Sequence, residues 1–272
     1  REALARAQDA GLAGTEPWYS VALNLARLEA MTGRPDAAMG RLDTLLAAAR
    51  GGDWHGPVAA GASDIAFRSG RVRRAADLLE ETIAVAPELL EPSFGALFTA
   101  YAEAQEAATS AGRVAEAAAI IAARIAILER YVPDAAPEAA QDLLFQKFAL
   151  LHDAGRPGGA ADALRAAAAA APLSEEERAF VADMAGMTLT LSRGAAYGAD
   201  RAAHLGAAEL AVAFAEVADG PGSPAAGLAL RELAAAQGAV GRHGAAAAAL
   251  GRALGLLEGT DAGRDTVHLL VE

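Results

Sequence analysis

The chain has 272 residues, 54% of them hydrophobic, so it can bury the core of one large domain or two average ones. Its 35 acidic and 23 basic residues give a net charge of −12, which disfavours nucleic acid as a partner because phosphate backbones select for lysine and arginine. The absence of cysteine excludes disulfides, thiolate zinc sites and cysteine nucleophiles, and no apolar run approaches the roughly 20 residues that span a bilayer.

Alanine dominates the composition, with 78 residues against only 5% aromatic residues. Alanine is the best helix former and has little preference for strands, whereas a sheet protein of this size would need many more β-branched residues. We therefore expect an all-α fold.

A Gly-Arg pair recurs along the chain at intervals of 37, 42, 43 and 86 residues, the last being twice 43. Each pair lies between two helical patterns, and an alanine follows each glycine five residues later. Such a period is typical of helical repeats. The glycines are Gly33, Gly70, Gly112, Gly155 and Gly241, and the alanines are Ala38, Ala75, Ala117, Ala160 and Ala246.

The spacing has a direct physical meaning. Glycine can end a helix in the left-handed conformation that other residues avoid, and a second helix then runs back along the first. The alanine is expected where the two helices cross, because a larger side chain would separate them. Pro87 and Pro172, each seventeen residues after a turn glycine, end two of the second helices.

In chain order we expect six antiparallel hairpins. Ser174 and Glu177 form a capping-box pattern, and Ser223 and Thr15 are expected to cap two other first helices, each ahead of an early proline. The fifth hairpin lacks the Gly-Arg pair and is expected to turn near Gly194 and Gly198. The hairpins cover about residues 17–50, 56–86, 92–131, 134–171, 174–218 and 223–257, made of helices at 17–32 and 35–50, 56–69 and 71–86, 92–111 and 113–131, 134–154 and 157–171, 174–192 and 197–218, and 224–239 and 243–257.

Residues 1–12 and 261–272 look like single helices without partners. A free-standing helical array generally needs polar caps at its ends. We therefore expect the chain to be a fragment of a longer protein, or to have its ends covered by a partner.

A helix hairpin with glycine at the turn, alanine five residues later and proline seventeen later resembles the tetratricopeptide repeat. The resemblance covers about residues 17–257, and its period of about 42 instead of 34 is similar to the kinesin-light-chain-type variant. Residues 249–258 are similar to the second helix of that variant. The resemblance implies a right-handed α-solenoid whose first helices line a concave groove for a peptide or protein. Bacterial arrays of this kind are often joined to an ATPase, a transcriptional regulator or a caspase-like protease.

The same resemblance implies where a partner would bind, by counting back from each turn glycine. Only Asn24 with Arg27 resembles part of the carboxylate-holding pattern known in the family. The implied groove residues are Asn24, Arg27, Asp64, Arg68, Glu103, Glu106, Asp142, Phe145, Gln146 and Arg231.

The middle of this implied groove is acidic, because Glu103 and Glu106 are three residues apart and Asp142 lies on the next first helix. One interpretation is that they bind a basic or mixed-charge segment with an apolar anchor near Phe145; the other is that they simply face water. The large aromatic residues Trp18, Tyr19 and Trp54 are expected to fill core rather than to anchor a partner.

Nothing in the sequence predicts chemistry. There is no phosphate-binding loop, no zinc-protease motif, no nucleophile elbow and no dinucleotide fingerprint. His152 and Asp153 are the one close histidine–acid pair, and adjacent residues on a helix point apart. We expect no catalytic residue, no metal and no cofactor.

The leading hypothesis is a non-enzymatic scaffold or adaptor for a protein or peptide partner. The alternative is a regulatory or sensor arm of a larger effector, from which this chain is a fragment. An enzyme or a small-molecule-binding module built on a helical array is a weaker hypothesis, because neither a deep polar pocket nor a ligand motif is evident. We expect a cytoplasmic location, although a secreted or periplasmic one is compatible with the sequence.

Overall fold

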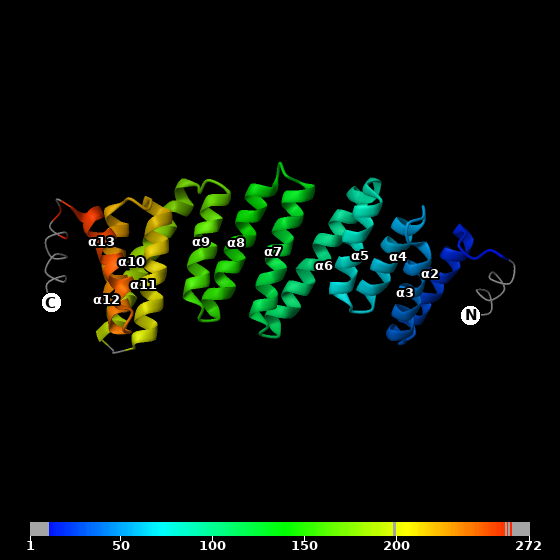
Figure 1. The fold of residues 1–272 in the computed structure, drawn as a ribbon, viewed down its shortest axis with the longest axis horizontal. Helices are drawn as coiled ribbons and strands as arrows, with labels where there is room; N and C mark the ends of the chain where they lie inside the picture. The colour runs from blue at the N-terminus through cyan, green and yellow to red at the C-terminus, as the bar shows by residue number, and fades with distance from the viewer. Residues whose placement is uncertain (1–10, 198–199, 259, 261, 263–272) are drawn as a thin grey trace. The chain divides into compact units, whose positions relative to one another are not determined.

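The computed structural model describes residues 11–197, 200–258, 260 and 262, and every regular element in these ranges is a helix (Figure 1). The expected all-α class is therefore confirmed for the described part of the chain. The helices are α2 (Glu16–Met31), α3 (Pro35–Ala49), α4 (His55–Arg68), α5 (Val72–Val85), the 3₁₀ turn η1 (Pro87–Leu89), α6 (Leu90–Ser110), α7 (Val114–Tyr131), α8 (Ala136–Asp153), α9 (Pro157–Ala170), α10 (Glu175–Tyr197), α11 (Arg201–Asp219), α12 (Pro224–Ala239) and α13 (His243–Leu257).

The largest departure from the predicted helix ends lies in the fifth hairpin. Helix α10 runs to Tyr197 instead of ending at residue 192, so Gly194 is inside the helix and the turn predicted there is wrong. One helical glycine costs only about 1 kcal/mol, and the packing of α10 along α11 outweighs that cost. Gly198 and nearly all of the unpaired helices predicted at 1–12 and 261–272 lie outside the described residues.

The five predicted glycine turns are confirmed. Gly33, Gly70, Gly112, Gly155 and Gly241 all have a positive φ, between 66° and 80°. At each turn the glycine N–H donates to the carbonyl three residues back and the arginine N–H to the carbonyl five residues back, as in Arg34 N–H to Glu29 O at 2.9 Å. This is the Schellman arrangement, which satisfies carbonyls that a helix end would otherwise leave unpaired.

The alanine five residues after each turn glycine has two roles. Its N–H donates to the carbonyl of the turn arginine at 2.9–3.1 Å and so starts the second helix. The four alanines Ala38, Ala75, Ala117 and Ala160 are completely buried, as expected for a helix crossing. Ala246 is only half-buried, because α13 is the last described helix and its main packing partner among the described elements is α12.

Two of the three predicted helix caps are present. The Ser174 N–H donates to Glu177 Oε2 at 2.8 Å and the Glu177 N–H donates to Ser174 Oγ at 3.2 Å, which completes the capping box. The Ser223 hydroxyl accepts from the Ala226 N–H at 3.1 Å. Thr15 is also the N-cap residue of α2, so the helix starts where the pattern predicts, but its hydroxyl donates backwards to Leu12 O at 2.6 Å instead of capping the helix.

The chain divides into two compact units, residues 1–120 and 121–272, and the division falls inside α7. In the first unit α2 packs on α3, α4 packs on α5, and the second hairpin packs on the first through contacts of α4 with α2 and α3; α6 then packs on α5. In the second unit the hairpins α8–α9, α10–α11 and α12–α13 follow one another through contacts of α11 with α9 and α12. Each unit is thus built from hairpins that pack on their sequence neighbours.

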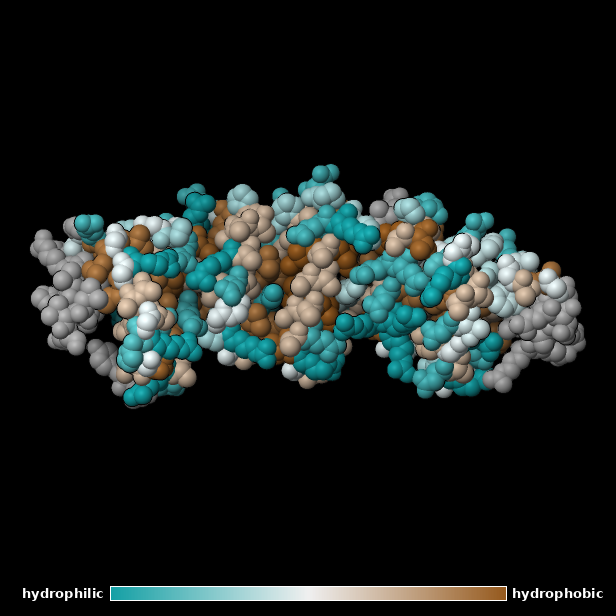
Figure 2. Space-filling model, in the orientation of Figure 1, coloured by the Kyte–Doolittle hydropathy of each residue, from teal (hydrophilic) through white to brown (hydrophobic). Residues whose placement is uncertain are grey.

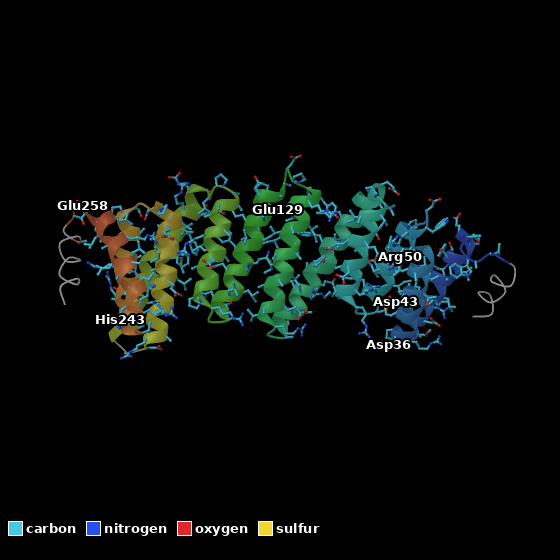
Figure 3. The ribbon with its side chains drawn as sticks, viewed as in Figure 1. Asp36, Asp43, Arg50, Glu129, His243 and Glu258 are labelled. Atoms are coloured by element: carbon cyan, nitrogen blue, oxygen red, sulfur yellow. The ribbon has the colours of Figure 1, made fainter. Side chains whose placement is uncertain are left out.

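Within each unit, ion pairs connect consecutive second helices. Asp36 and Asp43, which lie along α3 in Figure 3, pair with Arg71 at 2.6 Å and Arg74 at 3.0 Å on α5. In the second unit Glu216 on α11 lies between Arg165 on α9 and Arg252 on α13, at 2.8 and 3.1 Å.

The α3–α5 ion pairs are exposed and contribute only about 0–1 kcal/mol each, so burial of apolar surface has to supply most of the stability. Figure 2 shows that apolar surface on each unit lies in the seams between helices, while hydrophilic residues cover the helix ends.

Candidate functional site

Consecutive first helices in the first unit are spaced unequally. Helices α2 and α4 pack closely, and a Cβ at Gly61 would lie 3.0 Å from Leu23 Cδ1. Between α4 and α6, by contrast, lies a cavity of about 560 Å³, with α5 at its floor. We call it the α4–α6 hollow. Its lining residues are Ala60, Ser63, Asp64, Phe67, Ala75, Leu79, Leu89, Ser93, Gly95, Ala96, Thr99 and Ala100.

The lining of the α4–α6 hollow explains why it is open. Small residues face it from both first helices, including Ala60 on α4 and Ala96 on α6, so the side chains do not fill the space between the backbones. The buried Ser63 hydroxyl already donates to Ala75 O at 2.8 Å and therefore needs no ligand. The hollow is a mainly apolar site that an inserted apolar side chain could fill.

Three of the predicted groove residues come together at this hollow. Asp64 Oδ2 accepts from Arg27 Nη2 of α2 at 3.2 Å, and Asp64 Oδ1 accepts from Arg68 Nε, one turn along α4, at 2.8 Å. Asp64 lines the cavity, and both arginines are substantially exposed. The network contains one negative and two positive groups, so the charge beside the hollow is mixed.

The other predicted groove residues of the first unit are Asn24, Glu103 and Glu106, and all three are exposed. Close to the two glutamates in sequence, the Tyr101 hydroxyl donates to Glu80 Oε1 at 2.6 Å. Burial, together with this hydrogen bond, raises the pKa of Tyr101 above its ordinary value. Tyr101 thus remains a neutral hydrogen-bond donor that ties α6 to α5.

A second hollow, of about 340 Å³, lies between α8 and α10 in the second unit. Its floor is formed by the buried side chains of Leu164 and Phe214, and Phe148 packs edge-to-face on Phe214 at 5.6 Å between ring centroids. We call it the α8–α10 hollow. Its lining residues are Phe145, Phe148, Leu164, Glu176, Glu177, Phe180, Val181 and Phe214.

Of the groove residues predicted in the second unit, only Phe145 lines this hollow. Asp142 and Gln146 are exposed on α8, and Arg231 is half-buried on α12 and lines neither hollow. The sequence analysis missed Phe180, which is 65% exposed at the rim. The sequence alone gave no signal for it, because only the structure shows that Phe180 lies off the buried face of α10 that includes Val181.

Hydrogen bonding also distinguishes the carboxylates of this site. The Ser174 side chain and then its backbone N–H hold the pKa of Glu177 below its ordinary value, because both stabilise the charged form. Glu177 therefore serves the helix cap, while Glu175 and Glu176 beside it are exposed and carry negative charge to the start of α10.

One buried polar residue that positions α8 was not anticipated. Gln141 Nε2 donates to the carbonyls of Ala167 and Ala171 at 3.2 and 2.7 Å, at the end of α9. Both carbonyls lie at the C-terminal end of α9, where helix carbonyls need donors from outside the helix, and a side chain from α8 supplies one. This contact fixes one wall of the α8–α10 hollow.

Two histidine–carboxylate pairs could not be recognised in the sequence, because the partners are far apart in the chain. His55 Nε2 lies 2.7 Å from Glu81 Oε1, and the buried His204 Nε2 lies 2.9 Å from Glu232 Oε1. The nearby Ser192 hydroxyl donates to the backbone carbonyl of His204 and not to its ring. No activated nucleophile results, and these pairs join helices.

The described residues contain no group of three or more His, Cys, Asp or Glu that could hold a metal ion. Across the same part of the chain, every helix is too short or too polar to cross a membrane. The candidate site therefore consists of the two hollows and the charged groups around them.

No family model matches the sequence, and no curated protein matches it. Among solved structures, the chain is similar to nearly identical TPR-like repeats assigned to a kinesin light chain of Podosopora anserina, with 16% identity over 87% of this chain and 93% of that one and a TM-score of 0.27. A point variant of the same repeats matches with a TM-score of 0.26. Because both TM-scores are low, we base no conclusion on them.

Proposed function

We propose that this protein is a non-enzymatic interaction module that binds a peptide or protein segment along its first helices. The observation that carries the proposal is the α4–α6 hollow, an open apolar cavity on the face where three predicted groove residues meet. Stacked hairpins offer extended surface of this kind.

The lining of the hollow indicates what the bound segment would present. Phe67, Leu79 and Leu89 favour a large apolar side chain, such as leucine, methionine or phenylalanine. Arg27, Asp64 and Arg68 beside it favour a segment with both charged and neutral polar groups. The bound segment thus has mixed charge and an apolar anchor side chain. This anchor enters the α4–α6 hollow of the first unit, and a contact at Phe145 would be additional.

Selection from a peptide library tests this function. Peptides selected on the wild-type protein would be measured by fluorescence polarisation on the wild type, on Ala96→Phe, which fills the hollow, and on Ala48→Phe. Ala48 is an exposed alanine on α3, away from the hollow, and serves as the matched control. We expect Ala96→Phe to weaken binding at least tenfold and Ala48→Phe to leave it within about twofold, since tenfold corresponds to about 1.4 kcal/mol. Failure to select any peptide, or equal binding to both variants, would overturn the proposal.

A further inference from the structure

Helix α10 carries a second apolar face that no described part of the protein covers. Phe180, Met187 and Leu191 are 65%, 55% and 64% exposed. Their spacing of seven and four residues places them on one side of the helix. Val181 and Ser192, about 100° and 120° around the helix from Phe180, are buried. We call the three exposed residues the α10 stripe.

The α10 stripe continues a hollow. Phe180 lies at the rim of the α8–α10 hollow, and farther along the helix a shallow depression of about 440 Å³ includes Met187 and Leu191. From Phe180 to Leu191 the stripe is about 16 Å long, or three helical turns. That is the length over which an amphipathic helix presents four anchor side chains at i, i+4, i+7 and i+11.

The charges beside the stripe are negative. At about 100° per residue, Glu176 and Asp183 fall within roughly 60° of the stripe, whereas Arg178 and Arg193 fall more than about 120° away. Both arginines also have partners within the protein, Leu173 O at 3.4 Å and Glu232 Oε2 at 3.6 Å. Across the hollow, Asp142 is exposed on α8. The one nearby lysine, Lys147, lies on the other side of α8 from Phe145 and so points away from the hollow. The surface is therefore apolar with an acidic border.

A glycine beside the stripe is not explained by packing within the protein. At the helical glycines Gly206 and Gly227 a Cβ would lie only 2.9 Å from Pro157 or Leu257, so those two allow helices to approach. A Cβ at Gly186 would have nothing within 4 Å, as at several other helical glycines, and Gly186 is the one of these that lines the depression, with Asp183 and Met187. Its missing side chain leaves helix backbone accessible to a second helix.

A second copy of this chain fits the surface poorly. If two α10 helices paired antiparallel with Phe180 opposite Leu191, their Asp183 residues would be offset by only about 7.5 Å along the axis, within the Debye length. A parallel pair would place Asp183 directly beside Asp183. The net charge of −12 adds to this repulsion.

We infer that the α10 stripe and the α8–α10 hollow form a docking surface for a basic amphipathic helix of another protein. Apolar residues of that helix cover Phe180, Met187 and Leu191, and its lysine or arginine residues face Glu176 and Asp183. This surface is separate from the α4–α6 hollow and stands on different residues. Variants in α10 therefore test it without altering the α4–α6 hollow, on which the proposed function rests.

The test uses a fluorescein-labelled helical peptide of about 18 residues, or five turns, with leucine at i, i+4, i+7 and i+11 and lysine at flanking positions. Two control peptides have glutamate in place of lysine, or the same composition in scrambled order. Binding is measured on the wild type, on the triple variant Phe180→Ser, Met187→Ser, Leu191→Ser, and on Asp183→Lys. The matched control, Leu28→Ser with Met31→Ser, removes exposed apolar residues from α2 instead.

We expect the basic amphipathic peptide to bind the wild type at least tenfold more tightly than either control peptide. The triple variant and Asp183→Lys should each weaken binding at least tenfold, while the α2 control leaves it within twofold. All substituted side chains are exposed or accessible, so circular-dichroism melts should be near those of the wild type. Equal binding of the scrambled peptide, or of the triple variant, would overturn the inference. Self-association of the wild type that is lost in the triple variant would overturn it in favour of a second copy.

Discussion

The two hollows show how one repeated turn can support different surfaces. Both lie between consecutive first helices, and in both cases the preceding second helix ends before a proline, Pro87 or Pro172. The α4–α6 hollow is lined largely by small residues and lies beside Asp64 and its two arginines. The α8–α10 hollow is smaller, lined by four phenylalanines, and bordered by glutamates. The size of the lining side chains sets the volume of each hollow, and the exposed charges around it determine which charges a partner should carry.

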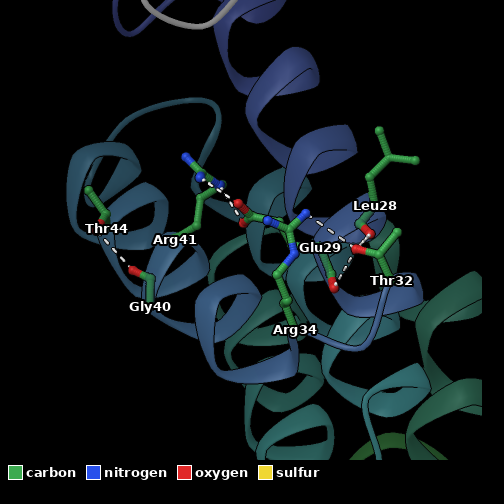
Figure 4. A network of polar contacts seen from close by, with 7 residues as sticks. All are labelled: Leu28, Glu29, Thr32, Arg34, Gly40, Arg41 and Thr44. Carbon is green, nitrogen blue, oxygen red and sulfur yellow. Dashed lines mark hydrogen bonds and ion pairs between the residues drawn. The ribbon is translucent and has the colours of Figure 1, made fainter. Parts of the chain in front are cut away.

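The turns themselves differ between the units at one buried position. The carbonyl that accepts from the turn arginine N–H belongs to Glu29 at the end of α2 and to Leu151 near the end of α8. Leu151 is an ordinary core residue, whereas the Glu29 side chain is 0% exposed and accepts from Arg41 Nε and Nη2 at 3.0 Å each (Figure 4). The first turn therefore buries a charge where the turn after α8 buries a leucine.

The largest effect is expected from breaking this ion pair. Glu29→Ala leaves the Arg41 guanidinium without its carboxylate and should lower the free energy of unfolding by about 3–5 kcal/mol, measured by urea denaturation. Arg71→Ala, which breaks an exposed pair with Asp36, should cost only about 0–1 kcal/mol. The double variant Glu29→Leu, Arg41→Leu replaces the ion pair with apolar side chains, as at Leu151, and should recover most of the lost free energy of unfolding. If Glu29→Ala is as stable as Arg71→Ala, the Glu29–Arg41 pair contributes little to stability.

An intermediate effect is expected at the alanine that follows the turn. Ala160→Leu adds three carbons to a completely buried position in α9 and should destabilise the protein by about 1–3 kcal/mol. Ala246→Leu occupies the same position of the repeat in α13 but is half-buried, so we expect a change below about 0.5 kcal/mol. Thermal melts monitored by circular dichroism would compare the two. Equal losses would mean that burial does not distinguish these alanines.

The smallest effects, of opposite sign, are expected at two glycines of the second unit. Gly155→Ala forces alanine into a left-handed conformation with φ near 66° and should cost about 1 kcal/mol. Gly186→Ala lies in the interior of α10, where the open space accepts a methyl group, and should stabilise the protein by about 0.5–1 kcal/mol. Chemical denaturation resolves both values. Destabilisation by Gly186→Ala would indicate a packing role that the structure does not contain.

The sequence predicted most of the helices because local physics decides them. Glycine at the five turns, proline after the second helices and serine at two caps act within a few residues of themselves, so they can be recognised without knowledge of the fold. At two positions another interaction prevailed. Thr15 stands at the predicted start of α2, but its hydroxyl bonds backwards, and the turn predicted at Gly194 is wrong because a long helix continues through that glycine.

The candidate site was only partly predictable. Counting back from the turn glycines selected Arg27, Asp64 and Arg68. Both arginines donate hydrogen bonds to Asp64, as residues on one face can. Arg231 did not join either hollow. Phe180 was missed because a single apolar residue on a helix reads equally well as core or surface until the buried face of that helix is known. The right-handed sense of the array and its long-period variant stay predictions.

The sequence by itself determined where the chain turns and which class of element it forms, because those outcomes depend on backbone preferences and on contacts within a few residues. Only the tertiary structure decided which first helices pack directly and which leave a hollow, and which buried groups pair across helices. Those outcomes depend on how side chains from distant segments fill space together, and no local pattern encodes the volume left between two helices.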